Sequence, residues 1–216
     1  MTASGAQMQR RAVSEHASPV EDLRINIGCG TAVAEGWWNV DNSPTIVLSR
    51  LKIGKRLLGV PDWPSNVHRH DVLKGLPFAD GTVSCIYSSH TFEHFTFEQS
   101  LSLARECWRV LRPGGVLRIA VPDLELIIRD YQRDSDPLAS HKFVERLELL
   151  HNWRDALHPG NHHSQMFDSR SLTELLRRAG FPAPKKCAFA ESQIPDILGV
   201  ELESRRRESL YVEGEK

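Results

Sequence analysis

The sequence predicts an α/β fold built on a largely parallel sheet. Short apolar runs with strand patterning alternate along the chain with segments whose apolar residues recur at helical spacing, and this alternation is typical of parallel sheets crossed by helices. The run 116–121 is almost continuously apolar and is closed by Pro122, as expected for a strand inside such a sheet. A Gly-Cys-Gly turn directly follows the first strand pattern, where α/β folds bring the backbone close to a ligand.

The first half of the chain contains most of the predicted parallel strands. Residues 23–27 alternate apolar and polar side chains and stop at the glycine turn, as a strand does. Apolar residues recur at helical spacing over 97–111, and Pro-Gly-Gly at 113–115 ends that helix. The remaining elements of this half are strands at 37–40, 66–70 and 83–87 and a helix at 45–58.

The second half continues the alternation after the 116–121 strand. Residues 123–153 have a mostly helical pattern that breaks near Asp136-Pro137, and 154–168 are irregular and rich in histidine. A helix over 169–179 is marked by a capping-box pattern from Ser171 to Glu174 and by a Gly180 stop. Final strands are predicted at 186–190 and 209–213.

Length and charge are typical of a globular single-domain protein. The chain has 216 residues, and its 27 Lys and Arg against 28 Asp and Glu give a net charge of −1. A broad basic face is therefore absent, and we expect no nucleic-acid partner. No apolar run approaches the ~18 residues that span a membrane, and no signal peptide is recognisable. We expect a disordered tail over 1–20, one domain over 21–216, reduced cysteines and a cytoplasmic location.

Acidic residues end two of the predicted strands. Asp41 closes the second and Asp71 the third, and the carboxyl ends of parallel strands share one edge of the sheet with the glycine turn. A carboxylate at the second strand can accept both hydroxyls of a ribose, and one at the third can accept from an exocyclic amine. The alternative is that both residues only cap turns, since a GxG without a third glycine is a weak signal.

Four segments resemble the class I S-adenosylmethionine-dependent methyltransferases, in particular their type 11-like branch. The segments are INIGCG, GWWNVD, HDVLKGLPFADGTVSCIYSSHTFEH and ARECWRVLRPGGVLRIAVPD, and the closing SLYVEGEK is similar to the family's last strand. The resemblance covers roughly residues 22–215. It implies a Rossmann-like fold with a mostly parallel seven-stranded sheet, an antiparallel last strand and helices on both faces. Acceptor-side insertions would lie at about 44–64 and 123–168.

The resemblance also assigns a cofactor site. In the family, the glycine turn lines the methionine moiety and ribose, the second-strand acid binds the ribose hydroxyls, and the residues after the third strand hold adenine. The residues after the fourth strand, here with His90, face the sulfonium and the acceptor. The implied cofactor-binding set is Asn26, Gly28, Cys29, Gly30, Asp41, Asp71, Val72, Ser88 and Ser89. Asn26 replaces the family's usual acid, and the segment between Gly30 and Asp41 is too short for a full first helix.

An HxxEH motif follows the fourth predicted strand as His90, Glu93 and His94. On a helix these side chains share one face and can converge on a metal ion. The motif is also the signature of inverted zincin peptidases, but its place in a nucleotide-type sheet opposes that interpretation. Ubiquinone-pathway O-methyltransferases resemble this segment and hold magnesium there, which makes Mg²⁺ the candidate ion, although histidine is a poor magnesium ligand. Alternatively, Glu93 and His94 cap the next helix.

A second histidine cluster, at 158–163, lies on the side where the resembling family builds its acceptor pocket. Histidine suits the removal of a hydroxyl proton near neutral pH. The catalytic candidates are therefore His163 and His162, with His90 from the first motif. A zinc site from His158, His162 and His163 lacks a nearby cysteine, and the alternative is a solvated loop.

These observations predict an S-adenosylmethionine-dependent O-methyltransferase of a saccharide or other small hydroxyl compound, in polysaccharide or glycolipid biosynthesis. The expected role in polysaccharide or glycolipid biosynthesis follows from a similarity to mycobacterial methyltransferases that cap methylmannose polysaccharide precursors. Transfer would be in line, promoted by proximity, with a histidine taking the proton. The alternatives are an N- or C-methyltransferase of a small molecule and a non-catalytic cofactor-binding subunit. The partners considered are a small-molecule or oligosaccharide acceptor and a second copy in a homodimer.

Overall fold

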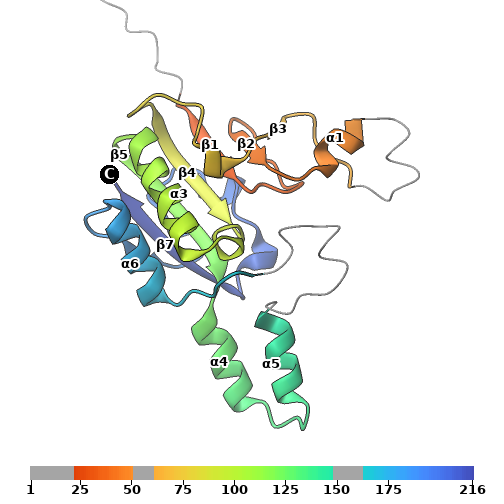
Figure 1. Ribbon diagram of the computed structural model, residues 1–216. Coiled ribbons are helices and arrows are strands. Elements are labelled where there is room, and N and C mark those ends of the chain that lie inside the picture. The colour runs from red at the N-terminus through yellow and green to blue at the C-terminus, as the bar shows by residue number, and fades with distance from the viewer. Residues whose placement is uncertain (1–21, 51–60, 148–162) are drawn as a thin grey trace, which may run out of the picture.

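The computed structural model describes residues 22–50, 61–147 and 163–216, which build a seven-stranded sheet (Figure 1). The strand order is β3-β2-β1-β4-β5-β7-β6. Strands β1 to β5 run parallel, and β7 is antiparallel to both of its neighbours. This confirms the expected class I architecture. The strands are β1 (Arg24–Ile27), β2 (Trp38–Asp41), β3 (Val67–Arg69), β4 (Val83–Ser89), β5 (Leu111–Pro122), β6 (Lys185–Cys187) and β7 (Ser209–Glu215).

Two helices cover one face of the sheet and pack side by side, α3 (Phe97–Val110) and α6 (Ser169–Ala179) (Figure 1). Their apolar faces are buried against the central strands, which removes apolar surface from water. The α6 capping box uses Asp168 and Ser171, so the predicted Ser171–Glu174 box is wrong. Glu174 instead pairs with two arginines one turn later on the exposed face. Gly180 ends α6 in the left-handed conformation, as predicted.

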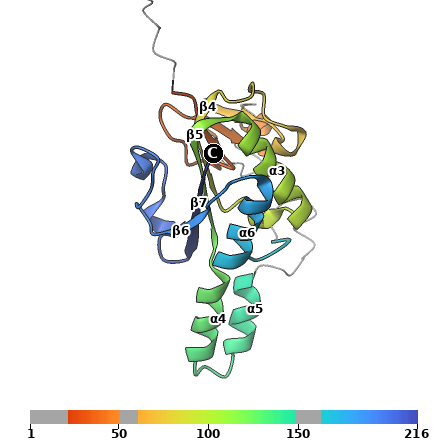
Figure 2. The ribbon, with the colours of Figure 1, turned by 90° about the vertical axis from the view of Figure 1, so that its left-hand side faces the viewer.

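The opposite face is covered by the segment between β6 and β7 (Figure 2). In this segment the structure has single 3-10 turns, η3 (Ile197–Gly199) and η4 (Glu203–Arg205), where we expected helices on both faces. Ile194, Ile197 and Val200 pack there in a second apolar cluster with side chains of β4 and β5.

A buried arginine fastens that segment to the sheet. Arg118, in the middle of β5, is fully buried. Its Nε donates to Glu201 Oε1 at 2.6 Å and its Nη1 donates to Glu213 Oε1 at 2.9 Å. Two further guanidinium contacts reach backbone carbonyls of the segment. The guanidinium fork thus joins β5, β7 and the covering segment.

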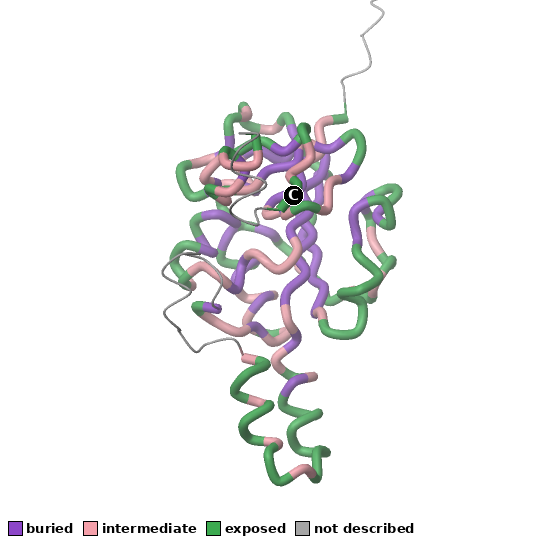
Figure 3. Tube along the Cα trace, turned by 90° about the vertical axis from the view of Figure 1, so that its right-hand side faces the viewer, coloured by how far each residue is buried: buried purple, intermediate pink, exposed green. Residues whose placement is uncertain are grey.

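The region after β5 forms a helical hairpin of α4 (Leu124–Arg133) and α5 (Ala139–Leu147) that projects beyond the sheet (Figure 2). The predicted break near Asp136-Pro137 is the turn between them. Most hairpin residues are exposed, whereas the central strands of the sheet are mostly buried (Figure 3). Helix α1 (Thr45–Arg50) follows β2.

Several predictions fall outside the described residues: the tail 1–20, the later part of the 45–58 helix, His158 and His162. All four cysteines are free thiols, with Cys29, Cys85 and Cys107 buried and Cys187 half-buried, which agrees with the expected reduced state. No helix in the described ranges is long and apolar enough to cross a membrane.

Candidate functional site

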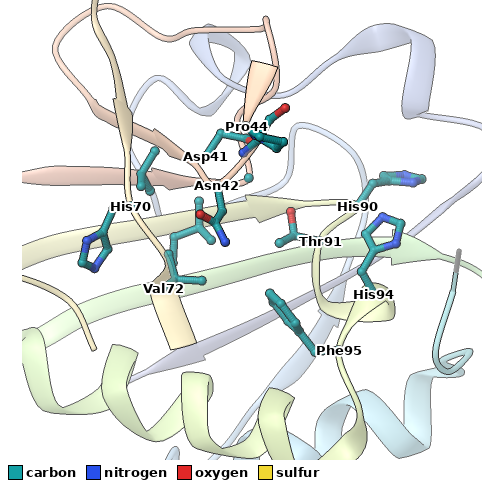
Figure 4. Close-up of a pocket in the computed structure, with 13 residues that line it drawn as sticks. Asp41, Asn42, Pro44, His70, Val72, His90, Thr91, His94 and Phe95 are labelled. Atoms are coloured by element: carbon teal, nitrogen blue, oxygen red, sulfur yellow. The ribbon is translucent and has the colours of Figure 1, made fainter. Parts of the chain in front are cut away.

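Three adjoining cavities lie at the carboxyl edge of the parallel strands, and His90 lines all of them. The Asp41 cavity, of about 350 Å³, extends from Asp41 past Val72 to Phe95 (Figure 4). The Gly30 cavity, of about 380 Å³, is lined by the glycine turn and by Asn26. The His163 cavity, of about 250 Å³, lies beyond His90. The three cavities share His90 as a lining residue and together make up the candidate cleft.

The glycine turn is shaped by close packing at one glycine and by open space at the other. Gly28 has φ +66°, and a Cβ built on it would overlap Thr91 Oγ1. Gly30 has φ +53°, and such a Cβ would meet nothing within 4 Å. Gly28 is therefore required for packing against Thr91. The open backbone at Gly30 has room for a ligand.

Asp41 is held at the end of β2 by backbone donors. Gly30 N donates to its Oδ2 at 3.1 Å and Ser43 N donates to its Oδ1 at 2.8 Å. The side chain lines both the Asp41 cavity and the Gly30 cavity. Each carboxylate oxygen keeps a further lone pair, so the predicted role as acceptor for two hydroxyls is compatible with these contacts.

A pair of buried amides replaces the missing first helix. Asn39 is fully buried, and its Oδ1 accepts from Asn26 Nδ2 at 3.0 Å and from Ala34 N at 3.0 Å. Its Nδ2 donates to Ala34 O and Trp37 O. These bonds order the loop after the glycine turn without helical hydrogen bonds. Sequence reasoning missed Asn39, whose position inside a short strand gave no signal.

The structure separates the predicted adenine residues. Val72 lines the Asp41 cavity. The Asp71 side chain caps the 3-10 turn η1 (Val72–Lys74) by accepting from Leu73 N at 3.2 Å, and it lines none of the three cavities.

The residues ending β4 point to different places. Ser89 lines the Gly30 cavity together with Cys29. Ser88 is fully buried and lines none of the three cavities. Alternation along a strand sends adjacent side chains to opposite faces, which explains why only one serine reaches the cleft.

His90 occupies a strained position at the junction of the cavities. Its φ is +49°, a left-handed conformation that costs a non-glycine residue about 1–3 kcal/mol. Its Nε2 lies 2.8 Å from Ser209 Oγ, and its Nδ1 lies 3.5 Å from Glu93 Oε1. Burial lowers the pKa of His90 to about 4, so the ring is neutral at pH 7.

The HxxEH segment contains a 3-10 turn, η2 (Phe92–His94), and not the regular helix on which the three side chains would share one face. Thr96 and Gln99 form the capping box of α3, so the alternative in which Glu93 and His94 cap that helix is wrong. Ligand atoms of Glu93, His94 and His163 lie within 4.8 Å of one another. Among the described residues, His163 thus takes the place in the candidate metal trio that the HxxEH motif assigns to His90.

Charged residues from distant segments complete the His163 cavity. Arg205 lines it and pairs with Glu208 at 2.6 Å. Arg146 of α5, which lies much earlier in the chain than Arg205, also lines this cavity. No local sequence pattern indicated that these residues meet, because each comes from a different element.

Comparisons with known proteins agree with this architecture. A family profile described as "Methyltransferase domain" matches residues 21–183. A curated protein of Mycolicibacterium smegmatis, named a probable S-adenosylmethionine-dependent methyltransferase, is 28% identical over 132 residues, which is 61% of this chain and 37% of that protein. The chain thus spans little more than a third of that relative's length.

Solved structures show the same fold at low sequence identity. The S-adenosylmethionine-dependent methyltransferase SibL aligns over 93% of this chain and 52% of its own, with TM-score 0.53 and 18% identity. A SAM-dependent methyltransferase from Archaeoglobus fulgidus aligns over 92% of this chain and 89% of its own, with TM-score 0.50 and 15% identity. Because the family profile matches most of the chain, the chain belongs to the class I S-adenosylmethionine-dependent methyltransferases.

Proposed function

We propose that the protein transfers a methyl group from S-adenosylmethionine to a hydroxyl of a saccharide or another small polyhydroxy molecule. The observation that carries this proposal is the polar lining of the His163 cavity. Its apolar members are Pro122 and Ile127, and its other members can form hydrogen bonds or ion pairs. These are His90, Glu93, His94, Arg146, His163, Arg205 and Glu208. Such a lining suits hydroxyl groups better than a flat aromatic ring.

The cofactor fits the other two cavities. The open backbone at Gly30 leaves room for its methionine part beside Asn26 and Cys29. Asp41, which lines both cavities, would accept the ribose hydroxyls. Val72 and Phe95 give the Asp41 cavity apolar walls for adenine, whereas Asp71, which caps η1 and lines none of the cavities, is left out of this site. When bound, the cofactor supplies an electrophilic methyl group on its sulfonium.

The chain's own contribution to catalysis is alignment and removal of a proton. His90 lines all three cavities, so an acceptor hydroxyl in the His163 cavity would meet the cofactor beside it. Holding the two reactants in line accounts for much of the acceleration in such a transfer. We propose that a histidine of this cavity removes the proton of the acceptor hydroxyl, and His163 is the first candidate. The other candidates are His90, which also lines this cavity, and His162, which lies outside the described residues.

The proposed biological context is polysaccharide or glycolipid biosynthesis, because such pathways supply hydroxyl-rich acceptors. A second copy in a homodimer remains part of the proposal, as does a location in the cytoplasm.

An acceptor panel tests the proposal. The full chain would be incubated with S-adenosylmethionine and matched sets of mannosides and other sugars, small amines and phenols, with methylated products identified by mass spectrometry. We expect turnover on a sugar hydroxyl. The variant His163→Ala should lower kcat by about 10²–10⁴-fold, the usual contribution of a general base, whereas the exposed His141→Ala on α5 serves as the matched control.

Methylation only of nitrogen or carbon acceptors would overturn the hydroxyl assignment. Tight binding of S-adenosylhomocysteine without turnover on any acceptor would instead favour a non-catalytic subunit.

A further inference from the structure

We propose that Glu93, His94 and His163 form a binding site for a divalent first-row transition metal ion. One ligand atom from each residue lies within 4.8 Å of the other two. The His94 and His163 rings lie next to each other, with centroids 5.3 Å apart and planes inclined by 58°. Glu93 is only 1% exposed and His163 only 6% exposed. Two imidazoles and one carboxylate thus converge in a place largely shielded from water.

The backbone fixes the two ligand-bearing segments together although they are far apart in sequence. Ser164 N and Gln165 N both donate to Glu93 O, at 2.7 and 3.2 Å. Ser164 Oγ donates to His94 O at 2.9 Å. The Gln165 side chain donates to Phe95 O at 2.9 Å and to Ser100 Oγ at 2.8 Å. The ligand side chains are therefore presented by a preformed scaffold, which lowers the entropic cost of binding an ion.

The tautomer of His163 is also set for coordination. Its Nδ1 lies 3.0 Å from Leu147 O. A carbonyl oxygen can only accept, so Nδ1 carries the proton and Nε2 is the ring nitrogen that can coordinate an ion. Metal-binding histidines commonly donate their second ring nitrogen to a backbone carbonyl in this way. This contact is an observation independent of the cluster geometry.

The donor set decides which ions bind. Imidazole suits zinc, copper, iron and nickel, whereas Mg²⁺ prefers oxygen ligands. A site with two histidines and one carboxylate leaves positions open on the ion. Here these positions would be available to a molecule in the His163 cavity, which all three residues line. We thus expect a transition ion here and not the Mg²⁺ suggested by the HxxEH motif.

Metal binding would change the role of one proposed catalytic residue. The Nε2 atom of His163 cannot coordinate an ion and accept a proton at the same time. If the acceptor hydroxyl binds the same ion, its pKa falls, and a histidine base is less needed. This consequence rests on the proposed function, whereas metal binding itself does not.

The test is metal titration of the full, untagged chain after chelator treatment and dialysis. Co²⁺ is added and followed by its visible absorption, and Zn²⁺, Mn²⁺ and Mg²⁺ are compared by calorimetry. We expect one equivalent of Co²⁺ or Zn²⁺ to bind, with Mg²⁺ at least ~100-fold weaker because of the donor set. Glu93→Gln and His163→Ala should each weaken binding at least ~100-fold, since even second-layer changes cost 10–100-fold.

His141→Ala is the matched histidine control and should bind like the wild type. Circular dichroism and the urea midpoint report whether each variant is folded. If Glu93→Gln fails to fold, His94→Ala, a partly exposed residue in the same trio, takes its place. Absence of a Co²⁺ band, or binding that survives the variants, overturns the metal site. Loss of S-adenosylhomocysteine binding by the wild type would instead count against the proposed function alone.

Discussion

Replacing Gly28 by alanine should destabilise the protein much more than the same change at Gly30. Both glycines have positive φ, +66° and +53°, so each alanine carries the strain of a left-handed L-residue, about 1–2 kcal/mol. At Gly28 the new Cβ would also overlap Thr91 Oγ1 and lie 2.9 Å from Thr91 Cβ and Cγ2. Overpacking of this kind costs about 1–3 kcal/mol more.

The expected loss in free energy of unfolding is therefore about 2–5 kcal/mol for Gly28→Ala, from strain and overpacking together. For Gly30→Ala it is about 1–2 kcal/mol, from strain alone. In a chain of this size each kcal/mol lowers Tm by about 2–4 °C. Urea denaturation followed by tryptophan fluorescence measures the free energy of unfolding of both variants. Thr91→Ala removes Oγ1 and Cγ2, so the double variant with Gly28→Ala should recover at least about 1 kcal/mol of coupling energy. Equal losses at the two glycines, or no coupling with Thr91, would refute the packing argument.

Three other predictions concern the scaffold. Arg118→Met should lower the free energy of unfolding by about 3–5 kcal/mol in chemical denaturation, because it leaves Glu201 and Glu213 as buried carboxylates without their cation; a loss below about 1 kcal/mol would contradict this role. Thr96→Ala should cost about 1 kcal/mol in the same assay, since it removes the α3 capping box, and an unchanged midpoint would count against that cap. At pH 8 the half-buried Cys187 should react first with a thiol reagent, and the other three thiols should react at comparable rates only in denaturant; rapid reaction of all four in the native protein would show that the core is open.

The order of strands and helices was predictable because it is recorded in local patterns. The apolar run of β5 and the alternation in β1 depend on burial of neighbouring residues, which the sequence displays directly. The boundaries of η2 were not predictable, since a three-residue 3-10 turn and the first turn of a helix have the same spacing. The covering segment before β7 has no periodic pattern, so its contact with the sheet was also missed.

The candidate site was predictable only where its residues end consecutive strands. Gly28, Gly30 and Asp41 meet because parallel strands share their carboxyl edge. His163 joins Glu93 through contacts between segments about seventy residues apart, and no local rule gives that pairing. Arg118 looked like a single polar interruption in an apolar strand. Its partners lie 83 and 95 residues away.

Calorimetry with S-adenosylhomocysteine tests the central claim most directly, because it asks whether the cleft around Gly30 and Asp41 holds the cofactor. We predict binding by the wild-type chain. Asp41→Ala should weaken it at least ~10-fold, since a hydrogen bond to a charged group contributes about 1.5–3 kcal/mol. Asp80→Ala, an exposed carboxylate outside the cavities, should leave the affinity unchanged. No binding by the wild type, or equal affinity in Asp41→Ala, would contradict the cofactor site described above.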